Sequence, residues 1–271
     1  MLGENILLFA PHPDDETICL GGWLFDRIAS GAQVWAVVVT DGEAFTKALR
    51  VRRKIKPSFL FRPHDYRVLG KLRREEASNS LNELGVPPAR RIFLGYPSGI
   101  LSKVVSSKNP KSLFRSKATK QRFGIGEWGL KNRKLHPYSR ASMEADFQKI
   151  ILLANPDIVL LPHPVDFNED HRAVAKMVLG ELSNIKRKSL LMAYLVHHGS
   201  RNVFPKPYGY RPSEGILPPR DLPLSNSYFP SKPAIKAKEK AINCHVSQIR
   251  LRDGFLISFI RRQEIFWRLM N

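Results

Sequence analysis

The stretch Asn5-Ile6-Leu7-Leu8-Phe9-Ala10-Pro11-His12-Pro13-Asp14-Asp15-Glu16 joins an apolar run to a dense polar cluster. The apolar run predicts a buried strand, and a helical pattern opens at Thr17. One imidazole and two neighbouring aspartates therefore lie on the turn between a strand and a helix. In an open α/β sheet this turn is the usual position for chemistry.

A second polar cluster, Leu161-Pro162-His163-Pro164-Val165-Asp166-Phe167-Asn168-Glu169-Asp170-His171, has the same setting. It follows the apolar run 158–160 and precedes a helical pattern over residues 172–182. If the two strands are neighbours in a parallel sheet, His171 can reach a metal held by His12 and an aspartate. The alternative interpretation is a pair of polar loops with helix-capping aspartates.

A catalytic zinc site needs three protein ligands, an open position for water and a neighbouring base. His12, His171 and one of the two aspartates supply the ligands, and the other aspartate is left beside the metal. The residues alone do not decide whether Asp14 or Asp15 is the ligand.

Strand and helix patterns alternate along most of the chain, which predicts one α/β domain over residues 1–271. We expect a Rossmann-like, mainly parallel sheet flanked by helices, with right-handed crossovers. The expected strands after the first cover residues 33–40, 91–94, 158–161 and 190–196, and the expected helices cover 17–30, 66–84, 139–155 and 172–182.

Three segments depart from this alternation. Residues 100–137 have little periodicity and many cations, which indicates a basic insertion near the mouth of the site. Residues 204–233 are rich in proline and predict extended segments on the surface. Residues 234–271 are expected to form C-terminal helices, the last over 255–270 with apolar residues beside arginines.

The chain of 271 residues is strongly basic, with 44 Lys and Arg against 24 Asp and Glu, a formal net charge of +20. Such a field attracts anionic ligands and acidic lipid surfaces. Because no nucleic-acid-binding motif accompanies the charge, we do not expect a specific nucleic-acid partner. We expect an anionic partner, nucleotide-linked or lipid-linked, with peripheral contact to the inner membrane face; a solubilising basic surface is the alternative.

Two cysteines are too few for a disulfide framework. The segment near Met1 lacks the basic leader and cleavage site of a signal peptide, and no apolar stretch approaches the roughly 20 residues that span a bilayer. We therefore expect a cytoplasmic protein. The sequence leaves the oligomeric state open.

The two clusters resemble motifs of the LmbE-like, or PIG-L, family of zinc-dependent N-deacetylases, whose first motif reads Ala/Pro-His-Pro-Asp-Asp-Glu and whose later motif ends in Asp-His. Other segments are similar to family motifs and follow in the family's order: Thr40 to Ala44, Arg73 to Ala77 with Leu84-Gly85, and Lys240-Ala241 with His245 to Gln248.

The resemblance implies that His12, Asp15 and His171 bind one Zn²⁺, with Fe²⁺ as the alternative metal, and that Asp14 is the general base. Asn168 stands where several relatives have a histidine that is thought to stabilise the oxyanion. An asparagine can donate a hydrogen bond but cannot be a cation.

The resemblance also implies substrate contacts. Glu43 and Arg73 correspond to positions that contact the saccharide, and Ser98 stands where the family often has an aspartate. Of the two histidines that end the strand pattern at 190–196, His197 and His198, we select His198 as a candidate substrate contact.

The expected function is hydrolysis of the N-acetyl group of an N-acetylglucosamine-type sugar or glycoconjugate, which releases acetate and a free amine. Asn168 and Ser98 motivate the alternative, a metal-containing saccharide-binding protein with little or no turnover. A dinucleotide-binding domain is disfavoured because the first turn lacks the glycine fingerprint.

Overall fold

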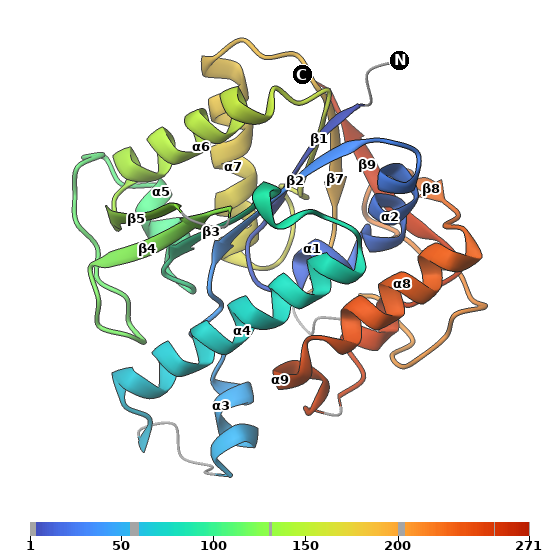
Figure 1. The fold of residues 1–271 in the computed structure, drawn as a ribbon, viewed down its shortest axis with the longest axis horizontal. Coiled ribbons are helices and arrows are strands. Elements are labelled where there is room, and N and C mark those ends of the chain that lie inside the picture. The colour runs from blue at the N-terminus through green and yellow to red at the C-terminus, as the bar shows by residue number, and fades with distance from the viewer. Residues whose placement is uncertain (1–3, 55–59, 130–131, 200–203, 252, 271) are drawn as a thin grey trace.

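The computed structural model describes residues 4–54, 60–129, 132–199, 204–251 and 253–270, and in these a nine-stranded sheet runs through the molecule with helices on both faces (Figure 1). The strand order is β5-β4-β3-β2-β1-β6-β7-β9-β8. This mixed but mostly parallel arrangement confirms the expected fold class. The strands are β1 (Asn5–Ala10), β2 (Gln33–Thr40), β3 (Arg91–Tyr96), β4 (Phe123–Trp128), β5 (Asn132–Pro137), β6 (Ile158–Pro162), β7 (Leu190–Tyr194), β8 (Asn226–Tyr228) and β9 (Glu264–Leu269).

The centre of the sheet is parallel and places the two polar clusters side by side. β1 pairs in parallel with β2 on one side and with β6 on the other, with Leu7 opposite Val159. The chain proceeds from β1 to β2 and β3 in one direction and from β6 to β7 in the other. The carboxyl ends of β1 and β6 therefore meet at a switch point, the position where open α/β sheets bind ligands.

The apolar run of β1 is continuous because both faces of the sheet are covered. Ile6 and Leu8 pack into one core with side chains of α1, α2, α4 and α8, whereas Leu7 and Phe9 pack into a second core with α6 and α7. The helices are α1 (Asp15–Ile18), α2 (Gly21–Ala29), α3 (Thr46–Arg53), α4 (Pro63–Glu83), α5 (Leu101–Val105), α6 (Arg140–Ala154), α7 (Glu169–Asn184), α8 (Lys232–Asn243) and α9 (Val246–Ile249), with 3-10 turns at Pro88–Arg90 and Leu256–Phe259.

The basic segment 100–137 is more regular than its sequence predicts. It contains α5 and an antiparallel hairpin, β4 and β5, that extends the sheet beyond β3; residues 130 and 131 lie outside the described part. Glycines weaken a strand pattern, and β4 contains two of them. A Cβ at Gly124 would lie 2.3 Å from the carbonyl oxygen of Gly95, so the close approach of the strands requires this glycine.

The expected helix over residues 255–270 is wrong. The structure has a 3-10 turn and then β9, which pairs antiparallel with β7 and with β8. Pairing with both neighbouring strands prevails here over the helical spacing of the apolar residues, and the first four residues of β9 are buried. The proline-rich segment before it contains β8, and its last two residues begin α8; the rest is extended or turned.

The last strand also contacts the first helices. Glu264, at the start of β9, accepts hydrogen bonds of 2.8 Å from the backbone N–H groups of Gly22 and of Trp23. It also pairs with Lys238 Nζ at 2.6 Å. Glu264 and Lys238 are buried. The carboxylate thus satisfies N–H groups that the first turn of α2 leaves without helical partners.

Among the described residues, no helix has the length and apolarity to cross a bilayer.

Candidate metal centre

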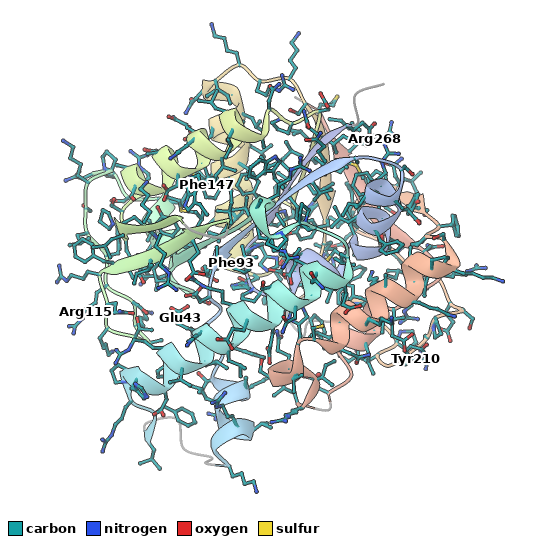
Figure 2. All side chains as sticks on the ribbon, in the orientation of Figure 1. Glu43, Phe93, Arg115, Phe147, Tyr210 and Arg268 are labelled. Atoms are coloured by element: carbon teal, nitrogen blue, oxygen red, sulfur yellow. The ribbon has the colours of Figure 1, made fainter. Side chains whose placement is uncertain are left out.

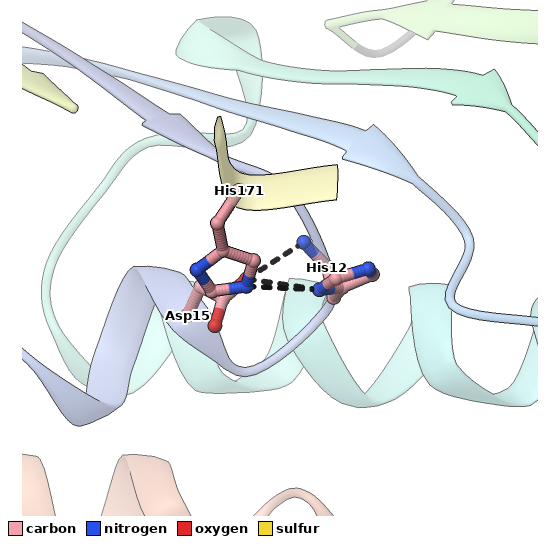
Figure 3. Close-up of side chains that lie close together, drawn as sticks. All are labelled: His12, Asp15 and His171. Atoms are coloured by element: carbon pink, nitrogen blue, oxygen red, sulfur yellow. Dashed lines mark hydrogen bonds and ion pairs between the residues drawn. The ribbon is translucent and has the colours of Figure 1, made fainter. Parts of the chain in front are cut away.

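Two histidines and an aspartate from the two polar clusters face one another in the structure (Figure 3). His12 lies on the loop after β1, Asp15 begins α1 and His171 lies in the first turn of α7. His12 Nδ1 is 3.2 Å from His171 Nε2, and Asp15 Oδ2 lies 3.3 Å and 3.1 Å from these nitrogens. The pairing of β1 with β6 thus brings together residues that are 159 positions apart.

Burial and close charges perturb all three groups. Burial lowers the pKa of His12, but its hydrogen bonds to Asp15 and Asp170 outweigh burial and raise it to about 9. Burial also opposes ionisation of Asp15, yet the charge of His171 and the hydrogen bonds from both imidazoles hold its pKa far below the usual range. The cluster therefore stabilises a carboxylate in a buried position.

Two further aspartates orient the imidazoles. Asp170 Oδ2 lies 3.1 Å from His12 Nε2 and accepts a hydrogen bond from the Gly99 N–H, while Asp170 Oδ1 accepts from the Leu101 N–H at the start of α5. Asp166 Oδ2 lies 3.2 Å from His171 Nδ1 and accepts from the N–H groups that follow β7. Both residues lie in the second polar cluster, but that cluster contains three acidic residues and the sequence gives no signal that separates these two.

The donor set fits a divalent metal such as zinc. Two imidazole nitrogens and one carboxylate oxygen converge, and tetrahedral catalytic zinc sites with three protein ligands use these donors. The second nitrogen of each ring faces a carboxylate, which is the usual arrangement around zinc-binding histidines. His12, Asp15 and His171 would hold the ion.

Asp14 lies beside this cluster in an unfavourable backbone conformation. Its φ is 133°, in a region that favours glycine. Its N–H donates to Glu16 Oε2 over 2.7 Å, and Glu16 Oε1 pairs with His245 Nε2 at 3.2 Å. Burial and then the charge of Asp15 raise the pKa of Asp14 to about 6, although Arg73 opposes the shift.

Arg73 and Glu43 join the loops around the site. Arg73 donates hydrogen bonds to the carbonyl oxygens of Gly42, at 2.7 Å, and of Pro13, at 2.8 Å. Its Nη2 lies 3.4 Å from Asp14 Oδ2. Glu43, which Figure 2 labels, is buried. Its two carboxylate oxygens accept from the Ser98 N–H at 3.1 and 3.2 Å. Burial and then the charge of Asp41 raise the pKa of Glu43 to about 8.

An open cleft of about 540 Å³ leads to the cluster. Asp14, Arg73, Ser98 and Asn168 all line it, so four of the six predicted catalytic and substrate-binding residues lie in its wall. Asn168 is also the N-cap of α7, where its Oδ1 accepts from the Asp170 N–H over 2.9 Å.

The two other predicted substrate contacts are placed differently. Glu43 lines a neighbouring cavity of about 360 Å³ instead of the cleft. His198 Nε2 lies 2.8 Å from Asp221 Oδ1, and the preceding histidine is the one that lines the cleft. His197 contacts the edge of His171 and stacks on Phe255, with ring centroids 5.2 Å and 5.6 Å apart. The strand pattern marks both histidines, but it does not indicate which one turns toward the site.

A Rossmann-like sheet with a His-Asp-His cluster and an adjoining carboxylate at its switch point defines a class of α/β proteins with a candidate metal centre. The sequence profile of the PIG-L family, described as GlcNAc-PI de-N-acetylase, matches residues 7–180. The chain therefore belongs to the PIG-L family. No curated protein matches the sequence.

Solved structures with the same fold include enzymes of more than one reaction type. The A40926 pseudoaglycone deacetylase Dbv21 shares 15% identity over 99% of this chain and 98% of its own, with a TM-score of 0.62. The N,N'-diacetylchitobiose deacetylase from Pyrococcus horikoshii shares 19% identity over 97% and 83%, with a TM-score of 0.57. GalB, a 4-carboxy-2-hydroxymuconate hydratase from Pseudomonas putida, shares 14% identity over 93% and 82%, with a TM-score of 0.55. The fold alone therefore does not determine the reaction.

Proposed function

We propose that the protein is a zinc-dependent hydrolase that removes the N-acetyl group from an N-acetylglucosamine-type sugar or glycoconjugate. The observation that carries the proposal is the position of Asp14, a carboxylate that lines the cleft next to the three-donor cluster of His12, Asp15 and His171. The matched family's description names a de-N-acetylase, which favours this reaction over hydration.

Zn²⁺ in such a site lowers the pKa of a coordinated water from about 15.7 to about 7 and polarises a carbonyl group. Asp14 accepts the proton of the attacking water, whose oxygen adds to the acetyl carbonyl carbon. As the C–N bond breaks, Asp14 returns the proton to the departing nitrogen, and acetate and the free amine result. A buried carboxylate is suited to both transfers, since burial raises the pKa of Asp14 above its usual range in the metal-free site.

Asn168 donates a hydrogen bond to the oxygen that becomes negative, since its side chain lies in the cleft wall and its Oδ1 is already engaged by the Asp170 N–H. Arg73 and Glu43 support the reaction through the loops that they join and Ser98 offers a hydroxyl to the sugar. We include His198 as an outer contact for an extended substrate.

The net charge of +20 supports an anionic substrate, lipid-linked or nucleotide-linked, that the protein meets in the cytoplasm or at the inner membrane face. Fe²⁺ is the alternative metal because imidazole and carboxylate ligands also suit iron.

The test is a panel of N-acetylglucosamine conjugates, lipid-linked, nucleotide-linked and thiol-precursor types, assayed for acetate and for free amine with the zinc-loaded protein. We expect equal amounts of both products from at least one conjugate and none from the Asp14→Ala variant, which retains its zinc. Saturable binding of a conjugate without acetate release would instead support a saccharide-binding protein.

A further inference from the structure

The helix α3 contributes an unusual surface to the mouth of the cleft. Residues 46–54 contain five cations and no carboxylate, and Lys47 on α3 lines the cleft itself. Arg50, Arg52 and Lys54 are exposed. The opposite side of α3 is apolar, because Ala48 and Leu49 are buried against Phe61 and Leu69 of the α4 region.

Exposed apolar side chains lie among these cations. Val51 of α3 is 41% exposed and Leu60 is 52% exposed. α3 also contacts α9, where Val246 is 42% exposed and Arg250 follows. Lys47, Arg50 and Val51 lie on the side of α3 away from Ala48 and Leu49, and Lys54 follows at its end. We call these four residues, with Leu60, Val246 and Arg250, the α3 surface.

A second loop at the same edge of the sheet adds to this face. Val165 and Phe167, on the loop after β6, are 50% and 52% exposed. Asn168, the next residue, lines the cleft. Because β2 and β6 are parallel to β1, the loops that follow them emerge at the edge of the sheet that holds the metal cluster. The cleft thus opens through a face with both cations and exposed apolar side chains.

We propose that this face docks on anionic lipid bilayers. Cations beside exposed apolar side chains are typical of peripheral contact with such surfaces, because the cations pair with phosphates and the apolar groups enter the interface. A basic surface that only provides solubility has carboxylates interspersed, and residues 46–54 have none. Nucleic-acid binding would use the cations but not Val51 or Leu60.

Docking in this orientation places the mouth of the cleft against the bilayer. A headgroup-linked substrate could then enter without leaving the membrane, which deepens the proposed function. The docking itself does not depend on catalysis, so vesicle binding and acetate release are measured separately.

The test is co-sedimentation of the full chain with vesicles of phosphatidylcholine, alone or with phosphatidylglycerol. The double variant Arg50→Gln/Lys54→Gln removes two exposed charges from the α3 surface. The matched control, Lys186→Gln/Lys188→Gln, removes two exposed charges between α7 and β7, at the opposite edge of the sheet. A third variant, Val51→Ser, changes the apolar contribution without altering the charge.

We expect the wild-type protein to bind the anionic vesicles and not to bind vesicles of pure phosphatidylcholine. Binding to the anionic vesicles should weaken in 0.5 M salt. Each basic residue near such a surface contributes about 1 kcal/mol, so the α3 double variant should bind roughly 30-fold more weakly. The control variant should bind as wild type does, and Val51→Ser should bind more weakly.

Equal losses in the two double variants would overturn the proposal, because net charge alone would then explain binding. Failure to bind anionic vesicles would also overturn it. So would binding to a DNA duplex that is tighter than binding to the vesicles and is unchanged in Val51→Ser. Release of acetate from a soluble N-acetylglucosamine conjugate should be the same in wild type and in Arg50→Gln/Lys54→Gln. Loss of vesicle binding would therefore not contradict the proposed deacetylation, and loss of acetate release would not contradict the docking.

Discussion

Glu16 holds the backbone of Asp14 through a hydrogen bond of 2.7 Å from the Asp14 N–H to Glu16 Oε2. The carboxylate that makes this bond is itself buried and paired with His245. A residue in a sparsely populated backbone region costs about 1–3 kcal/mol and persists where the surroundings fix it. Glu16 and His245 are the surroundings that fix the proposed base.

Substitution of Glu16 should reduce turnover without removing the metal. Glu16→Ala deletes the acceptor for the Asp14 N–H, and loss of such a supporting contact typically costs about 10- to 100-fold in activity. Glu16→Gln retains an acceptor oxygen and should recover part of that loss. Steady-state kinetics and zinc content measure both effects. A drop in zinc content that parallels the drop in kcat would show that Glu16 supports the metal cluster instead.

The conformation of Asp14 predicts an unusual order of stabilities. Glycine adopts a φ of 133° without steric cost, whereas alanine does not. Asp14→Gly should therefore exceed Asp14→Ala by about 1 kcal/mol in the free energy of unfolding, once the greater backbone entropy of unfolded glycine is deducted. Urea unfolding of the two inactive variants gives this difference, and a more stable alanine variant would contradict it.

Zinc should stabilise the metal-free protein through the three clustered ligands. At a free zinc concentration 100 times the dissociation constant, binding contributes about 2.7 kcal/mol to the free energy of unfolding. Thermal unfolding after chelator treatment, with and without added zinc, should show this as a higher Tm. His12→Ala and His171→Ala should lose the shift and Asp14→Ala should retain it; a full shift in His171→Ala would remove that residue from the ligand set.

Asn168 has two roles that a pair of variants can separate. Asn168→Asp keeps an N-cap acceptor for α7 but loses the amide donor, whereas Asn168→Ala loses both, and loss of a cap costs about 1 kcal/mol. We expect both variants to turn over slowly and only the alanine variant to lose stability. Wild-type kcat in Asn168→Asp would exclude the amide from oxyanion stabilisation.

Glu43 should make stability depend on pH. Its pKa rises from 4.5 to about 8 on folding, first because of burial and then because of Asp41. Between these two values the folded state keeps a proton on Glu43 that the unfolded state releases. The contribution of protonated Glu43 to the free energy of unfolding is therefore fully present below pH 4.5 and is lost as the pH rises to about 8. The free energy of unfolding of Glu43→Gln, measured by urea titration from pH 5 to 8, should fall less than that of wild type. Parallel curves would show that Glu43 is ionised in the folded protein.

The sequence indicates the fold and the metal cluster because both depend on local patterns. His12 and His171 each follow an apolar run, and parallel strands bring such positions to one edge. The orienting roles of Asp166 and Asp170 depend instead on loop conformations that the spacing does not encode. The tail at 264–269 was unpredictable for a related reason, since pairing with β7 is a contact between distant segments.

The carboxylate of Glu264 joins β9 to the first turn of α2, although the contacting residues are more than 240 positions apart in the sequence. During synthesis, more than 240 residues must be added after Gly22 and Trp23 before the Glu264 carboxylate is available to accept its hydrogen bonds. The first turn of α2 therefore gains its native acceptor only after β9 is made, and deletion of residues 264–269 should leave this turn more susceptible to proteolysis.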